Sequence, residues 1–289
     1  MGVVGLDIMS KRGERRKYLP LEIRAKMYED VVELRRQKLS YGQIQKILYK
    51  KYGKQISRPL ISYWVNRKHH PLGKVNKFNN KLSPELEYIN GVIFSDGCKY
   101  FNDGGYRLQL AVVDKEYAEE FGRCLAKVVG RKKPYEPYWN ENLKQWVVVG
   151  SSFQLYEFLN RPLEELKPYI EHCKDCVASF LRALFDGDGC IYVNIRKGRR
   201  ERKLCLCNTN KELLIYVQYL LKKYFDIDTT GPYLKTKSGK IAHFPNGIIT
   251  KTTEDCYYIY VRVKSLLNFY KHIGFTIKRK QQRLIKALK

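Results

Sequence analysis

Apolar side chains recur every three or four residues between positions 18 and 70, and this spacing predicts three short amphipathic helices. The first is expected over 21–37. The second begins after Ser40, whose partner Gln43 completes a capping box, and it ends at Gly53. The third begins after Ser57. The predicted inward-facing side chains are Ile23, Met27, Val31 and Leu34 in the first helix, Ile44, Ile47 and Leu48 in the second, and Leu60, Ile61, Trp64 and Val65 in the third.

Three helices of which the last two are short form the pattern of a helix-turn-helix domain. The segment "LSYGQIQKILYKKYGKQISRPLISYW" resembles the resolvase and transposase type of this domain. Residues 1–84 carry 20 basic and 6 acidic side chains, a net charge of +14, which favours DNA over a protein partner for the bundle. The side chains expected to face a major groove are Arg58, Ser62, Tyr63 and Arg67. We interpret 1–17 as a basic tail, 18–70 as the domain and 71–84 as a basic linker.

A repeated pattern divides the rest of the chain. The segments "YINGVIFSDGCKY" (88–100) and "SFLRALFDGDGCI" (179–191) each read as an apolar helix that ends in an acidic residue and a glycine. Each is followed by alternating strand patterns and further helices, with matching order in the two copies. The repeat predicts an α+β fold of two pseudo-symmetric αββαββα half-domains, over 85–178 and 179–289, preceded by the all-α domain.

The repeated helix has two unusual features. Gly91 with Ser95, and Ala183 with Gly187, place small residues four apart on one face, where they allow two helix backbones to approach closely. Asp96 and Asp188 then follow at the C-terminal ends, where the helix macrodipole disfavours an anion. Packed helices would bring these two carboxylates together, and such a pair normally requires a divalent cation.

The two segments resemble the LAGLIDADG homing endonucleases, in the single-chain type that carries two motifs. "INGVIFSDG" (89–97) and "LRALFDGDG" (181–189) match the nine-residue motif, and the first has Phe94 where the family often has Asp. The resemblance extends over about residues 85 to 289 and includes the terminal "IGFTIKRKQQRL". The N-terminal helix-turn-helix is similar to the arrangement in the archaeal subgroup of the family.

This resemblance implies a saddle of antiparallel strands over the DNA major groove and Mg²⁺, with Mn²⁺ as a substitute, held by Asp96 and Asp188. It implies a monomer that hydrolyses both strands of double-stranded DNA and leaves short 3′ overhangs, as in intron homing. The family's polar residue at the end of the second hairpin strand, often Gln, falls on Asp114 and Asn210. Its basic residue falls on Lys278 in the second half, with Lys280 as the competing register, and Lys174 is a guess for the first half.

Alternation along the strands indicates which side chains face the DNA. Leu108, Leu110 and Val112, like Leu204 and Leu206, are expected to face the helices. The opposite face and the second hairpin supply the expected DNA contacts, which are Arg107, Gln109, Arg196, Lys197, Arg199, Arg200, Arg202 and Lys203.

Composition agrees with a nucleic-acid partner. The chain has 55 Lys and Arg against 29 Asp and Glu, a net charge of +26, interleaved with 23 Tyr and 12 Phe. Its apolar runs are shorter than the ~20 residues that span a bilayer, so we expect a cytoplasmic protein without a membrane partner. Eight cysteines are expected to be reduced, although Cys173 and Cys176 could form a disulfide, or bind zinc with His172, Cys205 and Cys207.

Two other functions fit the same scaffold. One is a DNA-binding transcription regulator that has lost catalysis, and the other is an RNA-binding intron maturase. Asp96 and Asp188 argue against the regulator, because a protein that only binds DNA has no need to hold two anions together.

Overall fold

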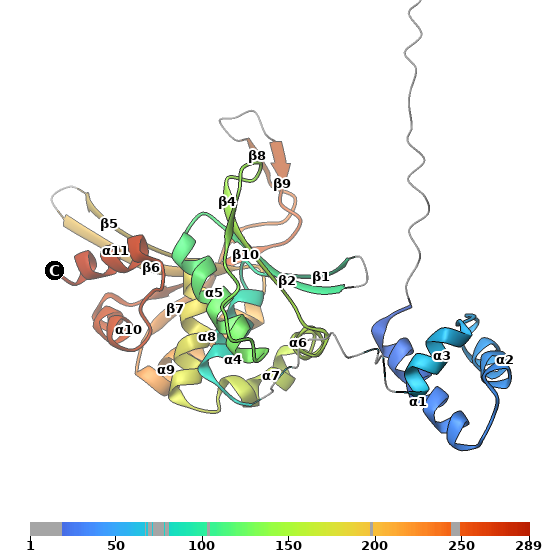
Figure 1. Cartoon of the computed structure of the whole chain (residues 1–289). Coiled ribbons are helices and arrows are strands. Elements are labelled where there is room, and N and C mark those ends of the chain that lie inside the picture. Colours follow the sequence, from blue (N-terminus) through green and yellow to red (C-terminus); the bar gives the residue numbers. More distant parts are fainter. Residues whose placement is uncertain are drawn as a thin grey trace, which may run out of the picture. The chain divides into compact units, whose positions relative to one another are not determined.

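The computed structural model describes residues 19–66, 68, 71, 78, 81–102, 105–196, 199–243 and 249–289. The chain divides into two compact units between Val75 and Asn76 (Figure 1). The predicted tail, 1–17, and most of the predicted linker, 71–84, lie outside the described residues. In the described part of the chain, every helix is too short or too polar to cross a membrane.

The first unit contains helices α1 (Leu21–Arg36), α2 (Tyr41–Tyr52) and α3 (Arg58–Val65). The capping box between Ser40 and Gln43 is present, and Gly53 ends α2 in the left-handed conformation with φ of 65°. The core of the unit consists of Met27, Val31, Ile44, Leu48, Ile56, Ile61 and Trp64. The prediction that Ile47 is buried was wrong, because Ile47 lies at the edge of the apolar stripe of α2 and remains 38% exposed.

The second unit repeats one set of elements. The first half contains α4 (Pro84–Ile93), β1 (Cys98–Asn102), β2 (Gly105–Val112), α5 (Lys115–Val128), β3 (Tyr138–Asn140), β4 (Gln145–Ser151) and α6 (Phe153–Leu159). The second half contains α8 (Lys174–Gly187), β5 (Gly189–Arg196), β6 (Arg199–Asn208), α9 (Lys211–Phe225), β7 (Thr229–Thr236), β10 (Cys256–Val261) and, after a 3₁₀ turn at Val263–Ser265, α10 (Leu266–His272). The predicted αββαββα repeat is confirmed.

Three additions distinguish the halves. Helix α7 (Leu163–Ile170) leads from the first half to the second, and α11 (Lys278–Leu288) follows α10. A separate hairpin of β8 (Ile241–His243) and β9 (Ile249–Lys251) lies between β7 and β10 in the sequence.

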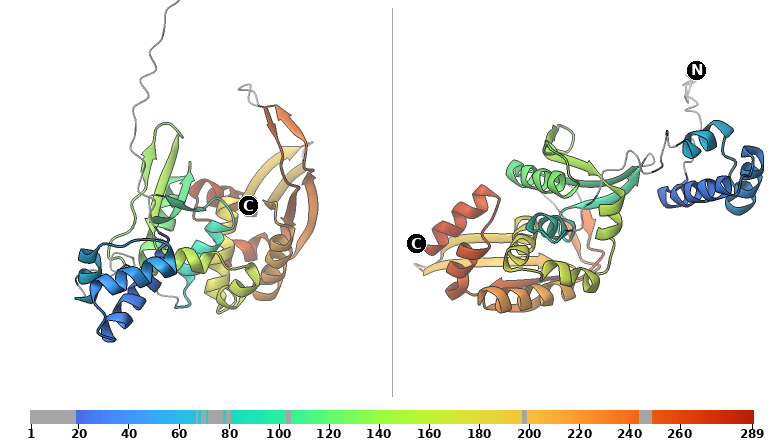
Figure 2. Two further views of the ribbon diagram at one scale, coloured as in Figure 1. Left: turned by 90° about the vertical axis from the view of Figure 1, so that its right-hand side faces the viewer. Right: turned by 60° about the horizontal axis from the view of Figure 1, so that its bottom comes forward.

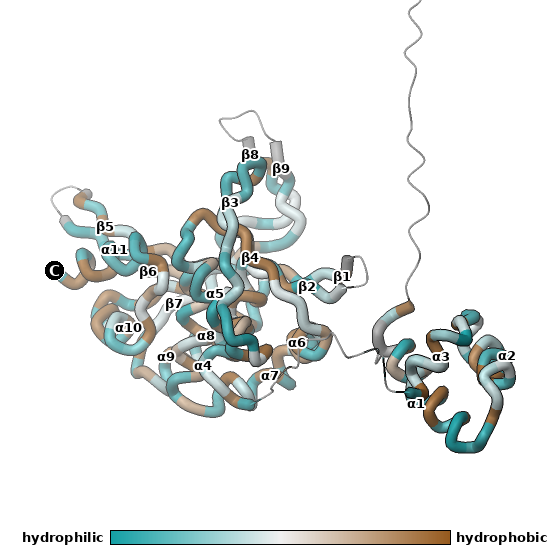
Figure 3. Tube along the Cα trace, viewed as in Figure 1, coloured by the Kyte–Doolittle hydropathy of each residue, from teal (hydrophilic) through white to brown (hydrophobic). Residues whose placement is uncertain are grey.

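The two four-stranded antiparallel sheets have equivalent strand orders, β1-β2-β4-β3 and β5-β6-β10-β7. Leu108 and Leu110 of β2, like Leu204 and Leu206 of β6, are at most 1% exposed, which confirms the predicted alternation. Figure 2 shows the two sheets on either side of the central helix pair α4 and α8. One apolar core runs through both halves, and hydrophobic and hydrophilic stretches alternate along its helices (Figure 3).

Candidate catalytic site

The site is built on the contact between α4 and α8. A Cβ atom added to Gly91 would lie 2.4 Å from the carbonyl oxygen of Phe180 and 2.7 Å from Cβ of Ala183. A Cβ atom added to Gly187 would lie 2.5 Å from Oγ of Ser95. Gly91 and Ala183 occupy equivalent positions of the two motifs, as do Ser95 and Gly187. Each small residue therefore meets its own counterpart, and a larger side chain would separate the helices.

Asp188 directly follows α8, and Asp96 lies in the turn that follows α4, three residues after Ile93. The contact at Gly187 places the Asp96 carboxylate at the end of α8, because an added Cβ there would lie 3.2 Å from Oδ2 of Asp96. The Asp96 side chain is exposed, whereas Asp188 is half-buried. Burial, opposed by a hydrogen bond from Asn208 and assisted by the charge of Asp96, raises the pKa of Asp188 to about 7. Although Asp96 is exposed as a residue, its carboxylate lies against the end of α8, where loss of surrounding water raises its pKa and the charge of Lys280 opposes that change.

Lys280 closes the C-terminal end of α8. Its Nζ donates to the carbonyl oxygens of Phe185 at 3.1 Å and Gly187 at 3.4 Å, and to that of Asp186 between them. The Lys280 side chain is 6% exposed, and burial lowers the pKa of its ammonium group. A cation at this end offsets the negative pole of the helix, and so it reduces the unfavourable placement of Asp188.

Lys278 and Lys174, the other two basic residues considered from the sequence, lie elsewhere. Lys278 is the exposed first residue of α11, and its backbone N–H donates to Oε1 of Glu116 at 2.9 Å. Lys174 is the first residue of α8, at the opposite end of that helix from Asp188, and its Nζ lies over the ring of Phe225. Of the basic residues considered from sequence, the structure brings Lys280 to the carboxylates.

The predicted polar partners, Asp114 and Asn210, also make other contacts. Asp114 accepts two hydrogen bonds from Arg279, at 2.6 and 2.7 Å, which join α5 to α11. Asn210 caps α9 by accepting a hydrogen bond from the N–H of Leu213 at 2.9 Å. Sequence reasoning missed Asn208, which donates to Oδ2 of Asp188 at 2.6 Å. The signal was present, because Asn208 is the last residue of the strand and a polar side chain on the face of Leu204 and Leu206.

A third carboxylate, Asp186, explains why the two motifs differ. It is 1% exposed and accepts hydrogen bonds from the backbone N–H groups of Thr276 and Ile277 and from the hydroxyl of Tyr88. These bonds tie the segment before α11 to α8. The equivalent residue in the first motif is Phe94, whose ring packs edge-on against that of Phe180, with the ring centroids 6.1 Å apart. Asp186 is therefore present in the half-domain that includes α11, where its hydrogen bonds fix the segment leading into that helix.

The predicted DNA-facing residues fall into two surfaces. On α3, Arg58 and Tyr63 are exposed and Ser62 is half-buried, while Arg67 lies outside the described residues. On the first sheet, Arg107 is exposed and Gln109 accepts a hydrogen bond from Tyr100 at 2.9 Å.

The basic hairpin of β5 and β6 is described in part. Lys197 lies outside the described residues, as do the side chains of Arg196 and Arg199. Lys203 shares the strand face of Cys205 and forms an ion pair with Glu201 at 3.7 Å. Arg202 alternates onto the opposite face. Arg200 also lies on that opposite face and donates to the carbonyl oxygen of Lys286 in α11 at 2.6 Å, so it supports α11.

Comparisons with known proteins find relatives along most of the chain. Residues 175–274 match the model of a LAGLIDADG-like domain. The uncharacterized protein MJ0398 of Methanocaldococcus jannaschii is 33% identical over 269 residues, which cover 89% of this chain and 91% of that protein. The structure of I-DmoI in complex with DNA and Mn has 16% identity and a TM-score of 0.46, and it covers 67% of this chain and 97% of that chain. The homing endonuclease I-WcaI bound to its DNA recognition sequence has 19% identity and a TM-score of 0.42, and it covers 70% and 88% of the two chains.

Proposed function

Since the chain belongs to the family of the uncharacterized protein MJ0398 of Methanocaldococcus jannaschii and contains a LAGLIDADG-like domain, we propose that it is a site-specific DNA endonuclease. It acts as a monomer and cuts both strands of double-stranded DNA. Each half-domain acts on one of the two strands. The cofactor is Mg²⁺, for which Mn²⁺ substitutes.

The observation that carries the proposal is the pair of carboxylates at the ends of two helices in backbone contact. Asp96 lies against Gly187, the residue before Asp188, and the pKa of both carboxyl groups is raised. Holding two carboxylates there without a cation costs free energy, and a divalent cation removes that cost. Carboxylate oxygens are the ligands that Mg²⁺ prefers, so this pair fits the ion.

The surrounding residues position these ligands. Asn208 fixes one oxygen of Asp188, and Lys280 holds the last carbonyls of α8, so that the carboxylate has a defined direction. Lys280 also places a positive charge beside the site, which favours the approach of phosphate. When bound to these carboxylates, Mg²⁺ would lower the pKa of water and stabilise charge on the scissile phosphate.

Two surfaces of the chain would hold the DNA. The sheet faces that carry Arg107 and Lys203 follow the phosphates on either side of the carboxylates. Helix α3, with Arg58 and Tyr63 exposed, reads a major groove outside the cleavage region. The net charge of +26 supports both contacts.

A library of randomised double-stranded DNA tests the proposal directly. Protein and library are incubated with Mg²⁺, and the ends of cleaved molecules are sequenced, with Asp96→Asn and Asp188→Asn as matched controls. We expect a single preferred site with staggered ends, and no double-strand cleavage by either variant. Cleavage that survives in both variants would contradict the proposed centre. Specific DNA binding without cleavage by the wild type would favour a regulator, and binding to RNA alone would favour a maturase.

A further inference from the structure

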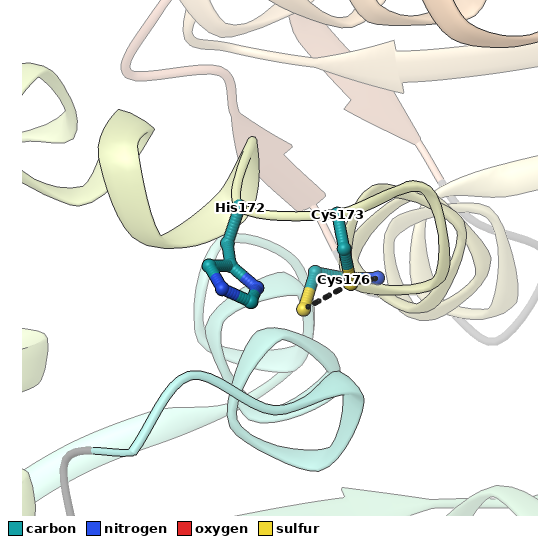
Figure 4. A group of neighbouring side chains, drawn as sticks. All are labelled: His172, Cys173 and Cys176. Atoms are coloured by element: carbon teal, nitrogen blue, oxygen red, sulfur yellow. Dashed lines mark hydrogen bonds between the residues drawn. The ribbon is translucent and has the colours of Figure 1, made fainter.

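A second cluster of potential metal ligands lies at the start of α8, the helix whose other end carries Asp188. His172 and Cys173 follow α7, and Cys176 lies in the first turn of α8. One imidazole nitrogen and two sulfur atoms lie within 4.8 Å of one another (Figure 4). The two sulfur atoms are 3.2 Å apart. Among the described residues, this is the one group of three or more His, Cys, Asp or Glu side chains close enough to hold a metal ion.

Cys173 occupies a position that other helices of this chain give to serine. It is the N-cap of α8, and its sulfur accepts a hydrogen bond from the N–H of Cys176 at 3.3 Å. The equivalent cap residues of α2, α3, α4 and α6 are Ser40, Ser57, Ser83 and Ser152. Sulfur is a weaker hydrogen-bond acceptor than a hydroxyl oxygen, so capping alone does not account for a cysteine at this position. A second role for the thiol would account for it.

The ligand types and their spacing select the metal. Thiolate and imidazole together suit Zn²⁺, with Zn–S distances of about 2.3 Å and Zn–N distances of about 2.0–2.1 Å. Tetrahedral ligands at those distances lie about 3.4–3.8 Å apart. Two sulfur ligands would lie about 3.8 Å apart, so the sulfur atoms, now 3.2 Å apart, need to separate slightly, and small rotations of the side chains would do this and bring in the imidazole. Figure 4 shows the His172 ring and the Cys176 sulfur turned toward each other.

Exposure differs across the cluster. Cys176 is buried, Cys173 is half-buried and His172 is exposed. The buried sulfur would hold a metal ion against the helix, and the exposed side of His172 would leave room for a water molecule as the fourth ligand. The positive end of the α8 macrodipole adds stability to the thiolates at this end.

We propose that His172, Cys173 and Cys176 bind one Zn²⁺ ion that ties the end of α7 to the beginning of α8. The cysteines at positions 205 and 207, which the sequence suggested as further ligands, lie on β6 and are not part of this cluster. The ion acts structurally, because it closes the connection between the two half-domains at the opposite end of α8 from Asp188. The proposal does not depend on the nuclease activity.

Metal content of the reduced, full-length protein tests the site. The protein is loaded with Zn²⁺ and passed over a desalting column, and the zinc content per chain is measured by inductively coupled plasma mass spectrometry. We expect one Zn²⁺ per chain in the wild type, loss of Zn²⁺ in Cys173→Ser and Cys176→Ser, and affinity weakened by more than about tenfold in His172→Gln. The matched control is the double variant Cys205→Ser with Cys207→Ser, which should keep its Zn²⁺.

Cobalt provides a second readout that does not require the cysteine variants to fold. Co²⁺ added to the reduced wild type should give the thiolate-to-cobalt charge-transfer absorption of two sulfur ligands, and His172→Gln should change its ligand-field bands. Wild-type protein that binds no Zn²⁺ would overturn the proposal. So would Zn²⁺ that is absent from the Cys205 and Cys207 control, or a Cys173–Cys176 disulfide that persists in the protein isolated from cells and excludes metal.

Discussion

The side-chain amide of Asn208 joins the ends of both motif helices. It donates to Oδ2 of Asp188 at 2.6 Å and to the carbonyl oxygen of Phe94 at 3.2 Å. The residue in the equivalent position of the first half is Val112, which is 8% exposed. The two carboxylates therefore lie in unequal surroundings, and Asp188 is the one held by a neutral hydrogen-bond donor.

Asn208→Ala should weaken metal binding and slow cleavage. The hydrogen bond favours the charged form of Asp188, so its removal raises the pKa of that carboxyl group further. A hydrogen bond to a charged group is worth about 1.5–3 kcal/mol, which corresponds to a decrease of about ten- to a hundredfold in Mn²⁺ affinity by calorimetry. Asn210→Ala is the matched control, because it removes a helix cap at a cost of about 1 kcal/mol and should leave the affinity unchanged. Equal affinity in all three proteins would contradict this role of Asn208.

Asp188→Asn should stabilise the metal-free protein above neutral pH. The folded-state pKa of Asp188, about 7, lies above its ordinary value of 3.8, so the folded protein keeps a proton that the unfolded chain releases. The wild type loses stability as pH rises from about 4 to about 7, by up to about 1.4 kcal/mol per unit. The variant avoids this loss and keeps an oxygen that accepts from Asn208.

Urea unfolding in the presence of a chelator, at pH 4.5 and pH 8, measures the effect. The two proteins should differ little at pH 4.5, and the variant should be more stable at pH 8 by a few kcal/mol. A variant that is less stable at pH 8 would show that burial of Asp188 carries no such cost. Added Mg²⁺ should narrow the difference at pH 8, since it binds the wild type alone.

The architecture could be predicted because the sequence pattern of each element occurs twice, once in each half-domain. A helix, hairpin, helix and strands in matching order fix the two halves, and alternation fixes which face of each strand is buried. The small residues could be assigned to a helix contact because side chains as small as those of Gly91 and Ala183 let two helix backbones approach closely, as they do here.

The side chains around the carboxylates could not be predicted to the residue. Asn208 and Asn210 are both polar and two positions apart. Tertiary packing, which the local sequence does not reveal, decides that Asn208 contacts Asp188 and that Asn210 caps α9. The same holds for α11. Its first residues are positioned by Glu116, Asp114 and Asp186, so long-range contacts decide that Lys280 points inward.

Gly91→Ala should destabilise the second unit. Its Cβ would lie 2.4 Å from a backbone oxygen of α8, so the helices must shift, at a cost of about 1–3 kcal/mol and with displacement of Asp96. Gly42→Ala in α2 is the matched control, because the nearest atom to its Cβ is 3.5 Å away in a flexible arginine. Alanine there should stabilise the first unit by about 0.5–1 kcal/mol. Calorimetric unfolding distinguishes the units, and an unchanged second transition in Gly91→Ala would contradict the close contact.

Lys280→Met should affect both stability and cleavage, whereas Lys278→Ala should affect neither strongly. The first change leaves the last carbonyls of α8 without their donor, which costs about 1–3 kcal/mol. It also removes the positive charge that opposes the rise in the pKa of Asp96, so cleavage should weaken most at low pH. The exposed Lys278 should change stability by at most about 0.5 kcal/mol. Cleavage that is lost in Lys278→Ala but retained in Lys280→Met would identify Lys278 as the basic residue of the site, as the sequence first suggested.

Deletion of residues 1–75 should preserve the cleavage position while weakening binding. The chain divides at Val75, and the first unit has its own core, so the remainder keeps α4, α8 and both carboxylates. A tethered DNA-binding module raises the affinity of the whole through effective concentration. For every phosphate that the first unit binds, its deletion should reduce the slope of log affinity against log salt by about 0.9.

Arg58→Ala separates reading of bases from attraction to phosphates. Arg58 is exposed at the start of α3, with its Nε bonded to Gln45 at 3.2 Å, so truncation leaves the core of the unit intact. If Arg58 binds a base, the variant should bind the cognate flank more weakly by about 1–3 kcal/mol and change much less on an unrelated flank. If it binds a phosphate, both flanks should weaken equally, and Lys54→Ala, exposed in the same unit, is the control for general charge. Footprints and salt slopes that are identical for the full-length and truncated proteins would mean that the first unit leaves this DNA untouched.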